Sequence, residues 1–386
     1  MLIYLLVFGV SIGLTVYGEY LNKKKNRKGF YLCMIFAVLL VVLLAGLRAV
    51  PVGTDGPAYE RWVQEAAEYE DFADARFVGR STEPVFMLLV YFVAKTTGSV
   101  YFLFALTALF TYGLFMAALI RLRNDSSIPF AWAAYLFLFF GHSLNELRQA
   151  LAMTALIFAF VLLREKKYLF SGIVVIAAVL CHNSAGLIAA GMLVVYCLLQ
   201  KWDTWFLKVG ILTTTALAVF GYEPVFYQLN RVGILPDRFS GYVAGASFIH
   251  FSLNPILVRL PFFLLVLFFY RDYAKDEGNS GEMTKVDADF LLVMMGMEMI
   301  LSELRVISVP LYRICLYFGV FRCLGIGRLV YAVNKSEKYK KWSKPLCAAL
   351  TGMLVVIWLY QVVLQGNDEI YPYTSEILHI GADTLF

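Results

Sequence analysis

The sequence predicts an all-α fold, a polytopic integral membrane helical bundle of about 12 transmembrane helices. Of the 386 residues, 60% are apolar and only 16% are charged, and the mean hydropathy is +0.71. Soluble domains carry about 25% charged and 45–50% apolar residues. The apolar residues come in blocks of about 15–23, the length that crosses roughly 30 Å of hydrocarbon. These observations exclude a soluble globular enzyme, a disordered chain and a nucleic-acid-binding protein.

Twelve apolar blocks are predicted to span the membrane. They lie at about 1–20, 29–50, 99–121, 128–141, 148–163, 168–181, 185–200, 207–221, 255–270, 286–301, 309–331 and 345–365. The first charged cluster, 22–28, follows the first block, whereas a cleaved signal has its charge before the apolar segment. With the N-terminus outside, this cluster and every later basic loop face the cytoplasm, as the positive-inside rule requires.

One apolar segment, near 83–97, is expected not to cross. Its uninterrupted apolar core is about ten residues long, which favours a re-entrant or interfacial helix over a span. The predicted extracytoplasmic loops are then about 51–98 and 222–254, and the C-terminal tail, about 366–386, also lies outside. No repeat or linker divides the chain, so residues 1–386 are expected to form a single integral membrane domain.

The six cysteines and the arginines support different conclusions. No CxxC spacing occurs, so the cysteines are interpreted as small core residues rather than as disulfide or metal ligands. On the predicted topology, the outer side carries ten arginines and one lysine. Arginine holds phosphate or carboxylate through two parallel hydrogen bonds. This distribution favours an outward cavity for a phosphate or pyrophosphate; pairing with outer acids is the simpler alternative.

The segment after the second predicted span contains the first candidate site residues. Arg48 lies near the outer end of that span, and Val52-Gly53-Thr54-Asp55-Gly56-Pro57-Ala58-Tyr59 follows. Two glycines and a proline around one carboxylate form a tight turn that holds Asp55 in a fixed direction. The alternative is that Asp55 only caps its own backbone.

A second group, Asn145-Glu146-Leu147-Arg148-Gln149, joins two apolar blocks on the outer side. Charged residues at membrane depth are costly and usually face a cavity or a partner. Asn145, Arg148 and Gln149 are therefore candidate binding residues. Glu146 is a candidate catalytic carboxylate, although it can also simply pair with Arg148.

Two further candidates stand in apolar surroundings. His182, in Cys181-His182-Asn183-Ser184, can exchange a proton near neutral pH, although the segment can also be a simple turn. Arg313 lies in the outer third of an apolar span, with Tyr317 one turn later. This pair suits an anion next to a sugar, and snorkelling of Arg313 to the interface is the alternative.

Several motifs that carry other chemistries are absent. The sequence contains no Walker loop, no dinucleotide-binding glycine fingerprint, no HExxH and no GxSxG. No His, Cys and Asp residues cluster at metal-ligand spacing. ATP-driven transport and metal-assisted hydrolysis are therefore disfavoured, and neither a cofactor nor a metal is expected.

An ordered set of short motifs resembles a known family over nearly the whole chain. The set consists of Arg48 with Val52-Gly53-Thr54-Asp55 and Tyr59, Glu83-Pro84, Asn145-Glu146-Leu147-Arg148-Gln149-Ala150, His182-Asn183-Ser184-Ala185, Arg313 with Tyr317-Phe318, and Tyr371-Pro372-Tyr373. In this order they resemble the EpsG family, whose members are similar to Wzy-type polysaccharide polymerases. The family's histidine motif often begins with an aromatic residue, and here Cys181 takes that place.

The resemblance implies a metal- and nucleotide-independent membrane glycosyltransferase in the bacterial cytoplasmic (inner) membrane, with its active site facing outside. Its substrate would be an oligosaccharide linked to undecaprenyl pyrophosphate, within membrane lipid, and a flippase and a chain-length regulator are the implied protein partners. We expect Arg48, Arg148 and Arg313 to bind pyrophosphate and Asp55 or His182 to activate the acceptor hydroxyl. Glu83 and Glu146 are reserve carboxylates. Gln149, Tyr59, Asn145 and Tyr317 complete the expected binding residues.

Two other functions remain possible from the sequence. A flippase for lipid-linked oligosaccharides would also use arginines in a cavity, but such transporters often contain repeated halves and this chain shows none. A membrane O-acyltransferase that modifies glycans is kept open by His182 alone.

Overall fold

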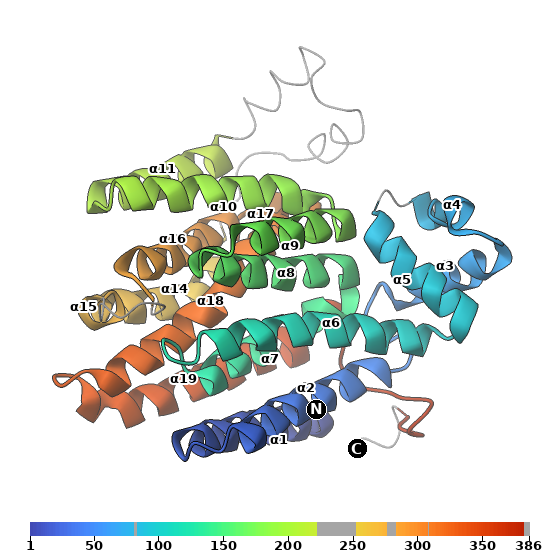
Figure 1. Cartoon of the computed structure of the whole chain (residues 1–386), viewed down its shortest axis with the longest axis horizontal. Helices are drawn as coiled ribbons and strands as arrows, with labels where there is room; N and C mark the ends of the chain where they lie inside the picture. Colours follow the sequence, from blue (N-terminus) through green and yellow to red (C-terminus); the bar gives the residue numbers. More distant parts are fainter. Residues whose placement is uncertain (81–82, 222–251, 276–282, 308, 382–386) are drawn as a thin grey trace, which may run out of the picture. The chain divides into compact units, whose positions relative to one another are not determined.

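The computed structural model describes residues 1–80, 83–221, 252–275, 283–307 and 309–381, without the side chains of residues 80, 307, 309 and 310 (Figure 1). Throughout these ranges the regular elements are helices, accompanied by one isolated bridge between Ser375 and Ile380. The all-helical fold class is therefore confirmed. The predicted loop 222–254 lies outside the described residues, apart from its last three positions.

The described chain divides into two compact units, which are treated separately here. The first unit comprises residues 1–187 and 338–386, and the second comprises residues 188–337. The single integral membrane domain stays a prediction.

The first unit contains α1 to α9, the start of α10, and the C-terminal helices. Their bounds are α1 Leu2–Lys23, α2 Arg27–Gly46, α3 Gly56–Glu68, α4 Phe72–Ala75, η1 Val78–Arg80, α5 Pro84–Thr96, α6 Val100–Arg121, α7 Ile128–Asn145, α8 Leu147–Arg164, α9 Tyr168–Cys181, α10 Ser184–Lys201, η2 Lys340–Trp342, α19 Ser343–Trp358, η3 Leu359–Leu364 and η4 Asn367–Glu369. The helix α1 packs against α2 and α7, and α6 packs against α2 and α8. The helix α9 packs against α8 and α5.

The second unit contains most of α10 and the elements up to residue 337. Their bounds are α11 Trp205–Phe220, α14 Leu253–Phe268, α15 Tyr270–Tyr273, α16 Lys285–Leu301, α17 Leu304–Ile307 and α18 Val309–Lys335. The helix α16 packs against α11, α14 and α18. It begins with a capping box in which Thr284 and Asp287 satisfy each other's backbone N–H groups.

All twelve predicted spans coincide with helices, but the count of twelve crossings is not confirmed. Among the described residues, seven helices are both long and apolar enough to cross a membrane: α1, α2, α6, α8, α10, α18 from Leu311 onward, and the segment Lys340–Leu364. Four other helices, α5, α9, α11 and α14, are apolar but shorter. The chain is therefore a polytopic membrane protein with at least seven candidate spans. The 13-residue α5 confirms a helix near 83–97, and its re-entrant or interfacial position stays a prediction.

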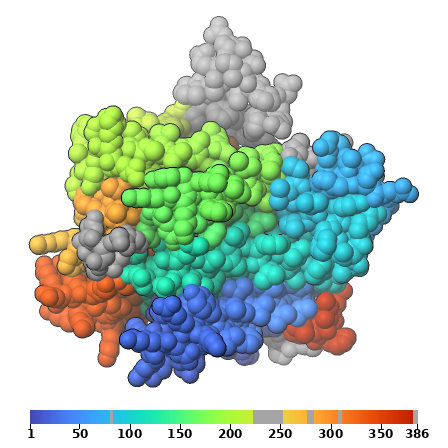
Figure 2. All heavy atoms as spheres, in the orientation of Figure 1, coloured from blue at the N-terminus to red at the C-terminus, as the bar shows by residue number. Residues whose placement is uncertain are grey.

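The predicted loop 51–98 is a folded helical layer in the first unit. Its helix α3 is amphipathic, with Tyr59, Val63 and Ala66 buried and Glu65 and Glu68 exposed. The buried side of α3 joins a hydrophobic cluster with Phe86 on α5 and with residues of α6. This packing holds α3 and α5 against each other (Figures 1 and 2).

The C-terminal tail after η3 packs along the first unit, and its atoms lie directly beside the α2–α3 loop in Figure 2. The hydroxyl group of Tyr373 donates to the carbonyl oxygen of Leu44 at 3.1 Å, and the Tyr4 hydroxyl donates to the carbonyl oxygen of Ile370 at 2.6 Å. Rings of Tyr4 and Tyr373 meet edge to face at 5.5 Å. The tail is therefore bound in place by specific contacts.

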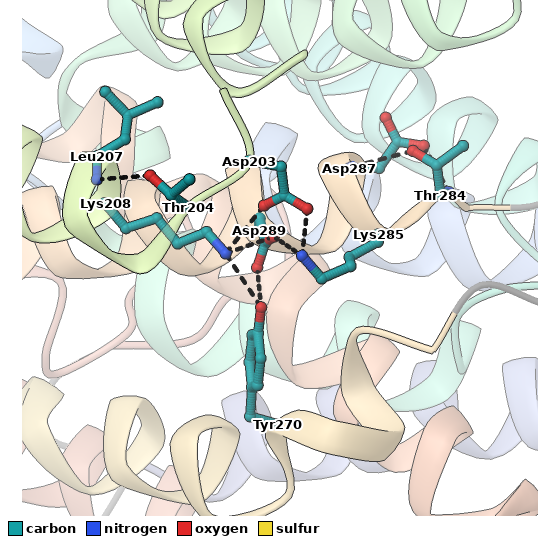
Figure 3. Close-up of polar contacts among 9 residues, drawn as sticks. All are labelled: Asp203, Thr204, Leu207, Lys208, Tyr270, Thr284, Lys285, Asp287 and Asp289. Atoms are coloured by element: carbon teal, nitrogen blue, oxygen red, sulfur yellow. Dashed lines mark hydrogen bonds and ion pairs between the residues drawn. The ribbon is translucent and has the colours of Figure 1, made fainter. Parts of the chain in front are cut away.

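A charge network, in which Lys208 and Asp289 are buried, ties the second unit together at one end of α11 and α16 (Figure 3). Lys208 Nζ lies 2.6 Å from Asp289 Oδ2 and 3.1 Å from Asp203 Oδ1, and it donates to the Tyr270 hydroxyl at 3.1 Å. Lys285 pairs with both aspartates. Two lysines facing two aspartates balance in charge, so we interpret this network as structural.

Candidate functional site

A polar site in the first unit is centred on Glu83. Glu83 Oε1 lies 2.6 Å from His182 Nδ1 and accepts a hydrogen bond from the backbone N–H of Asn183 at 3.2 Å. Its other oxygen, Oε2, accepts a hydrogen bond from Arg148 Nη1. One carboxylate thus bridges the predicted histidine and one of the predicted arginines. The Glu83 side chain is 6% exposed, against 21% for His182 and 27% for Arg148.

Helix ends position these three side chains. Glu83 is the residue before α5, where Pro84 begins the helix, a favoured place for proline. His182 ends α9, and Arg148 lies in the first turn of α8. Because α9 packs against both α5 and α8, the three ends meet.

The charge state of Glu83 follows from its partners. Burial alone would raise the pKa of Glu83, but the hydrogen bond from His182 and the charge of Arg148 outweigh burial and hold that pKa below its usual value. The ionised carboxylate can only accept hydrogen bonds, so Nδ1 of His182 carries the proton toward Glu83. In the neutral imidazole, Nε2 is then the ring nitrogen with a lone pair, which suits a general base.

Aromatic residues of α3 cover Arg148. Its guanidinium carbon lies 5.0 Å from the centre of the Trp62 ring, a cation–π distance. The Tyr59 hydroxyl also interacts with Arg148, and burial raises the pKa of Tyr59 to about 12, so this phenol stays neutral. The ring of Trp62 is itself held edge to face by Tyr59 at 5.4 Å. Arg148 is therefore oriented by a carboxylate on one side and by α3 on the other.

The two other predicted carboxylates lie close to this group. Asp55 is the residue before α3, and its backbone carbonyl oxygen accepts hydrogen bonds from the N–H groups of Ala58 and Tyr59. Both Asp55 and Glu146 interact electrostatically with the Tyr59 hydroxyl. Glu146 is the one residue between α7 and α8. The structure thus brings Asp55, Tyr59, Glu146 and Arg148 together with the Glu83–His182 pair.

Arg48 has surroundings that argue for a structural role rather than the predicted pyrophosphate-binding one. Its side chain is fully buried. It donates to the carbonyl oxygens of Val52 at 3.2 Å, Ala45 at 2.7 Å and Leu144 at 2.8 Å. The guanidinium also stacks 3.7 Å from the centre of the Phe104 ring. Arg48 therefore joins the end of α2 to the end of α7.

Asn145 and Gln149 are also buried, at 5% and 2% exposed. Asn145 Oδ1 accepts from the backbone N–H of Thr54 at 2.7 Å, and its Nδ2 donates to the carbonyl oxygen of Asp368 at 2.7 Å. Gln149 Nε2 lies 3.8 Å from the sulfur of Met153, within α8. These contacts favour a structural role for Asn145, and the expected binding role of Gln149 stays a prediction.

Arg313 and Tyr317 lie on α18 in the second unit, where Arg313 is half-buried and Tyr317 is buried. The site around Glu83 is therefore described without them, and their expected roles stay predictions.

The second unit also contains a buried ion-pair cluster that the sequence did not predict. Glu298 Oε1 lies 2.9 Å from Arg259 Nε and 3.1 Å from Arg322 Nη2, and all three side chains are buried.

Sequence reasoning ranked Glu83 too low and missed Trp62 and Asp368. The sequence signals for Glu83 were its place directly before a proline and an apolar segment, the pattern of a helix start, and its membership of the family motif set. For Glu298, its place as the one carboxylate in the apolar run 290–301 was a usable signal, because an intramembrane charge implies a partner. Asp368 carried no signal, since it stands in a polar stretch near the chain end.

Comparisons with known proteins agree with the motif set. The sequence model of the EpsG family matches residues 31–375 of the chain. No curated protein is significantly similar to the chain, and no solved structure is significantly similar either.

Proposed function

The chain belongs to the EpsG family, and on this premise we propose that it is a Wzy-like polysaccharide polymerase of the bacterial cytoplasmic membrane. It transfers a growing glycan from undecaprenyl pyrophosphate onto the next lipid-linked repeat unit at the outer face. The observation that carries the proposal is the bridge of Glu83 between His182 and Arg148. The bridge supports the proposal because it holds an imidazole and a guanidinium on one carboxylate.

The proposed reaction is a glycosyl transfer. An acceptor hydroxyl oxygen attacks the anomeric carbon of the growing chain, and the bond from that carbon to the pyrophosphate oxygen breaks. The hydroxyl proton passes to Nε2 of His182, and undecaprenyl pyrophosphate leaves with the bonding electrons. Glu83 holds the imidazole in the required tautomer and stabilises the imidazolium that forms.

Arginine provides the counter-charge for the leaving group. Preoriented cationic donors stabilise charge that develops in the transition state without reorganising. Arg148 is such a donor in the first unit, because Glu83 and Trp62 fix its orientation. We assign the same role to Arg313 from its place in the outer third of its span, and sugar contact to Tyr317. Asp55 and Glu146, which reach the site through Tyr59, orient the acceptor.

The test uses purified protein in liposomes with a lipid-linked repeat unit and neither nucleotide nor metal, and products are separated by size. Wild type is expected to yield a ladder spaced by one repeat. His182→Ala and Glu83→Gln are expected to slow ladder formation by about 10²–10⁴-fold, the usual contribution of a general base. Glu68→Gln, an exposed carboxylate on α3, is the matched control.

Two results would contradict the proposal. A wild-type preparation that forms no ladder but moves fluorescent lipid-linked sugar between leaflets is a flippase. If His182→Ala forms the ladder at the wild-type rate, then His182 does not act in the reaction. The implied flippase and chain-length regulator partners are absent from this assay, so chain length is not used as a criterion.

A further inference from the structure

The C-terminal turn Gly366–Glu369 has an unusual backbone. Gly366, Asp368 and Glu369 have φ values of 65°, 66° and 50°, in the left-handed region. This region is sterically disfavoured for most residues with a side chain. Such conformations persist when the surrounding contacts impose them, and they concentrate at functional sites. The contacts of Asp368 therefore identify what this turn is held against.

Asp368 is bound to the end of α7 in two ways. Its Oδ1 lies 2.9 Å from His142 Nδ1, and its carbonyl oxygen accepts from Asn145 Nδ2 at 2.7 Å. Its carboxylate also lies against Gly141, where an added Cβ would lie 2.5 Å from Oδ2. Both the side chain and the backbone of Asp368 thus contact the last helical turn of α7.

Further hydrogen bonds connect this turn to the loop before α3. Asn145 uses its other amide atom, Oδ1, to accept from the N–H of Thr54 at 2.7 Å. The next tail residue, Glu369, accepts at its carbonyl oxygen from the N–H of Gly53 at 3.0 Å. The backbone N–H groups of the two residues directly before Asp55 are therefore both held: that of Gly53 by the tail turn itself, and that of Thr54 by Asn145, which the tail turn binds.

We propose that Asp368 is a positioning residue of the site around Glu83, fixing through Asn145 the loop that holds Asp55 near Tyr59. The inference rests on the proposed function, because it gives Asp55 a role in orienting the acceptor. Asp368 itself touches none of the groups assigned to the reaction. It acts through the loop Gly53–Asp55.

This role is separate from general anchoring of the tail. Other tail residues bind elements away from the loop: Glu376 Oε2 accepts from the Tyr101 hydroxyl at 2.7 Å, and Tyr373 donates to Leu44. The tail thus stays attached when Asp368 is changed. Glu376 provides a matched control, a tail carboxylate that is also hydrogen-bonded to the first unit.

The experiment compares Asp368→Gly, Asp368→Asn and Glu376→Gln in the full chain. Glycine removes the carboxylate and also relieves the left-handed backbone, so its folding is protected. Asparagine keeps a side-chain oxygen that can accept a hydrogen bond from Nδ1 of the His142 ring. The first measurement is hydrogen exchange of the amides of Gly53 and Thr54, and the second is the steady-state kinetics of polymer formation.

For Asp368→Gly we expect both amides to exchange at least about tenfold faster. The turnover number should fall by about tenfold and the KM for the lipid-linked repeat should change less than about twofold, because misplacing a group that acts in the reaction lowers turnover. Asp368→Asn should restore most of both values, and Glu376→Gln should match wild type.

Unchanged exchange at Gly53 and Thr54 in Asp368→Gly would overturn the inference, and so would faster exchange with unchanged turnover. A fall in turnover for Glu376→Gln equal to that for Asp368→Gly would also overturn it, since the tail would then act as a whole. The exchange measurement needs no substrate. If wild type forms no polymer, the proposed function fails while the exchange data still decide whether Asp368 holds the loop.

Discussion

Glu83 Oε1 lies 2.6 Å from Nδ1 of His182, although 99 positions separate the two residues in the chain. The same carboxylate also binds Arg148. Because α5, α8 and α9 each contribute one helix end, the pairing depends on how these helices pack.

Acid is expected to destabilise the protein through Glu83. Its pKa is held below the ordinary value of 4.5 in the folded state, so the stabilising contribution is complete above about pH 5 and decreases as pH falls through the folded pKa. Thermal unfolding of the detergent-solubilised protein between pH 3 and 7 measures this contribution. Glu83→Gln should flatten that part of the pH profile, and an unchanged profile would contradict the pairing.

Arg48→Lys should destabilise the protein without a specific loss of substrate binding. Lysine replaces a guanidinium that donates to three carbonyl oxygens, and each charge-assisted hydrogen bond contributes about 1.5–3 kcal/mol. With two such bonds lost, we expect about 3 kcal/mol lower stability, measured by thermal unfolding in detergent. Arg61→Lys, on the exposed side of α3, is the control. Normal stability combined with lost substrate binding would return Arg48 to a binding role.

Gly53→Ala should impair both stability and activity more than Gly98→Ala. Both glycines have positive φ, at 95° and 63°, so both substitutions strain the backbone. A Cβ at Gly53 would lie 2.3 Å from Asn145 Oδ1, whereas a Cβ at Gly98 meets nothing within 4 Å. The difference isolates the contact with Asn145. Equal effects of the two substitutions in the liposome and thermal assays would show that this contact is dispensable.

Glu298→Gln should strongly destabilise the second unit. Removing one partner of a buried ion pair costs about 3–5 kcal/mol, because the remaining charge is left buried, and here two arginines depend on one oxygen. Combining Glu298→Gln with Arg322→Met should recover part of the loss in thermal stability. Glu337→Gln, an exposed carboxylate after α18, is the control. Wild-type stability of the single variant would refute the coupling.

Arg313→Ala should abolish polymer while single repeat units accumulate and the protein still inserts normally. The expected cause is loss of the cation that neutralises pyrophosphate. Immunodetection of the membrane fraction and a size separation of lipid-linked glycans measure the two quantities. Arg123→Ala, an exposed arginine between α6 and α7, is the control. Polymer of wild-type length in Arg313→Ala would remove Arg313 from the site.

The sequence by itself determined where the apolar helices are, whereas α3 and α4 lie within the predicted extracytoplasmic loop 51–98. An apolar block long enough to cross the membrane reports a transfer free energy that depends on local composition, so all twelve predicted segments coincide with helices. The helix at Pro84–Thr96 was predicted as well, from an apolar segment too short to cross the membrane. Composition also determined the membrane class, and the ordered motifs indicated the family that the match over residues 31–375 shows.

Only the tertiary structure decided the partners of the polar residues. Arg48, Arg148 and Arg313 look alike in sequence, yet Arg48 is bound by backbone carbonyl oxygens and Arg148 by Glu83. A buried polar side chain takes whichever partner packing brings within hydrogen-bond distance, and residues such as Asn145 and Asp368 are 223 positions apart. Local sequence carries no information about that distance. The roles of Glu83 and Asp368 therefore emerged from the packed helices.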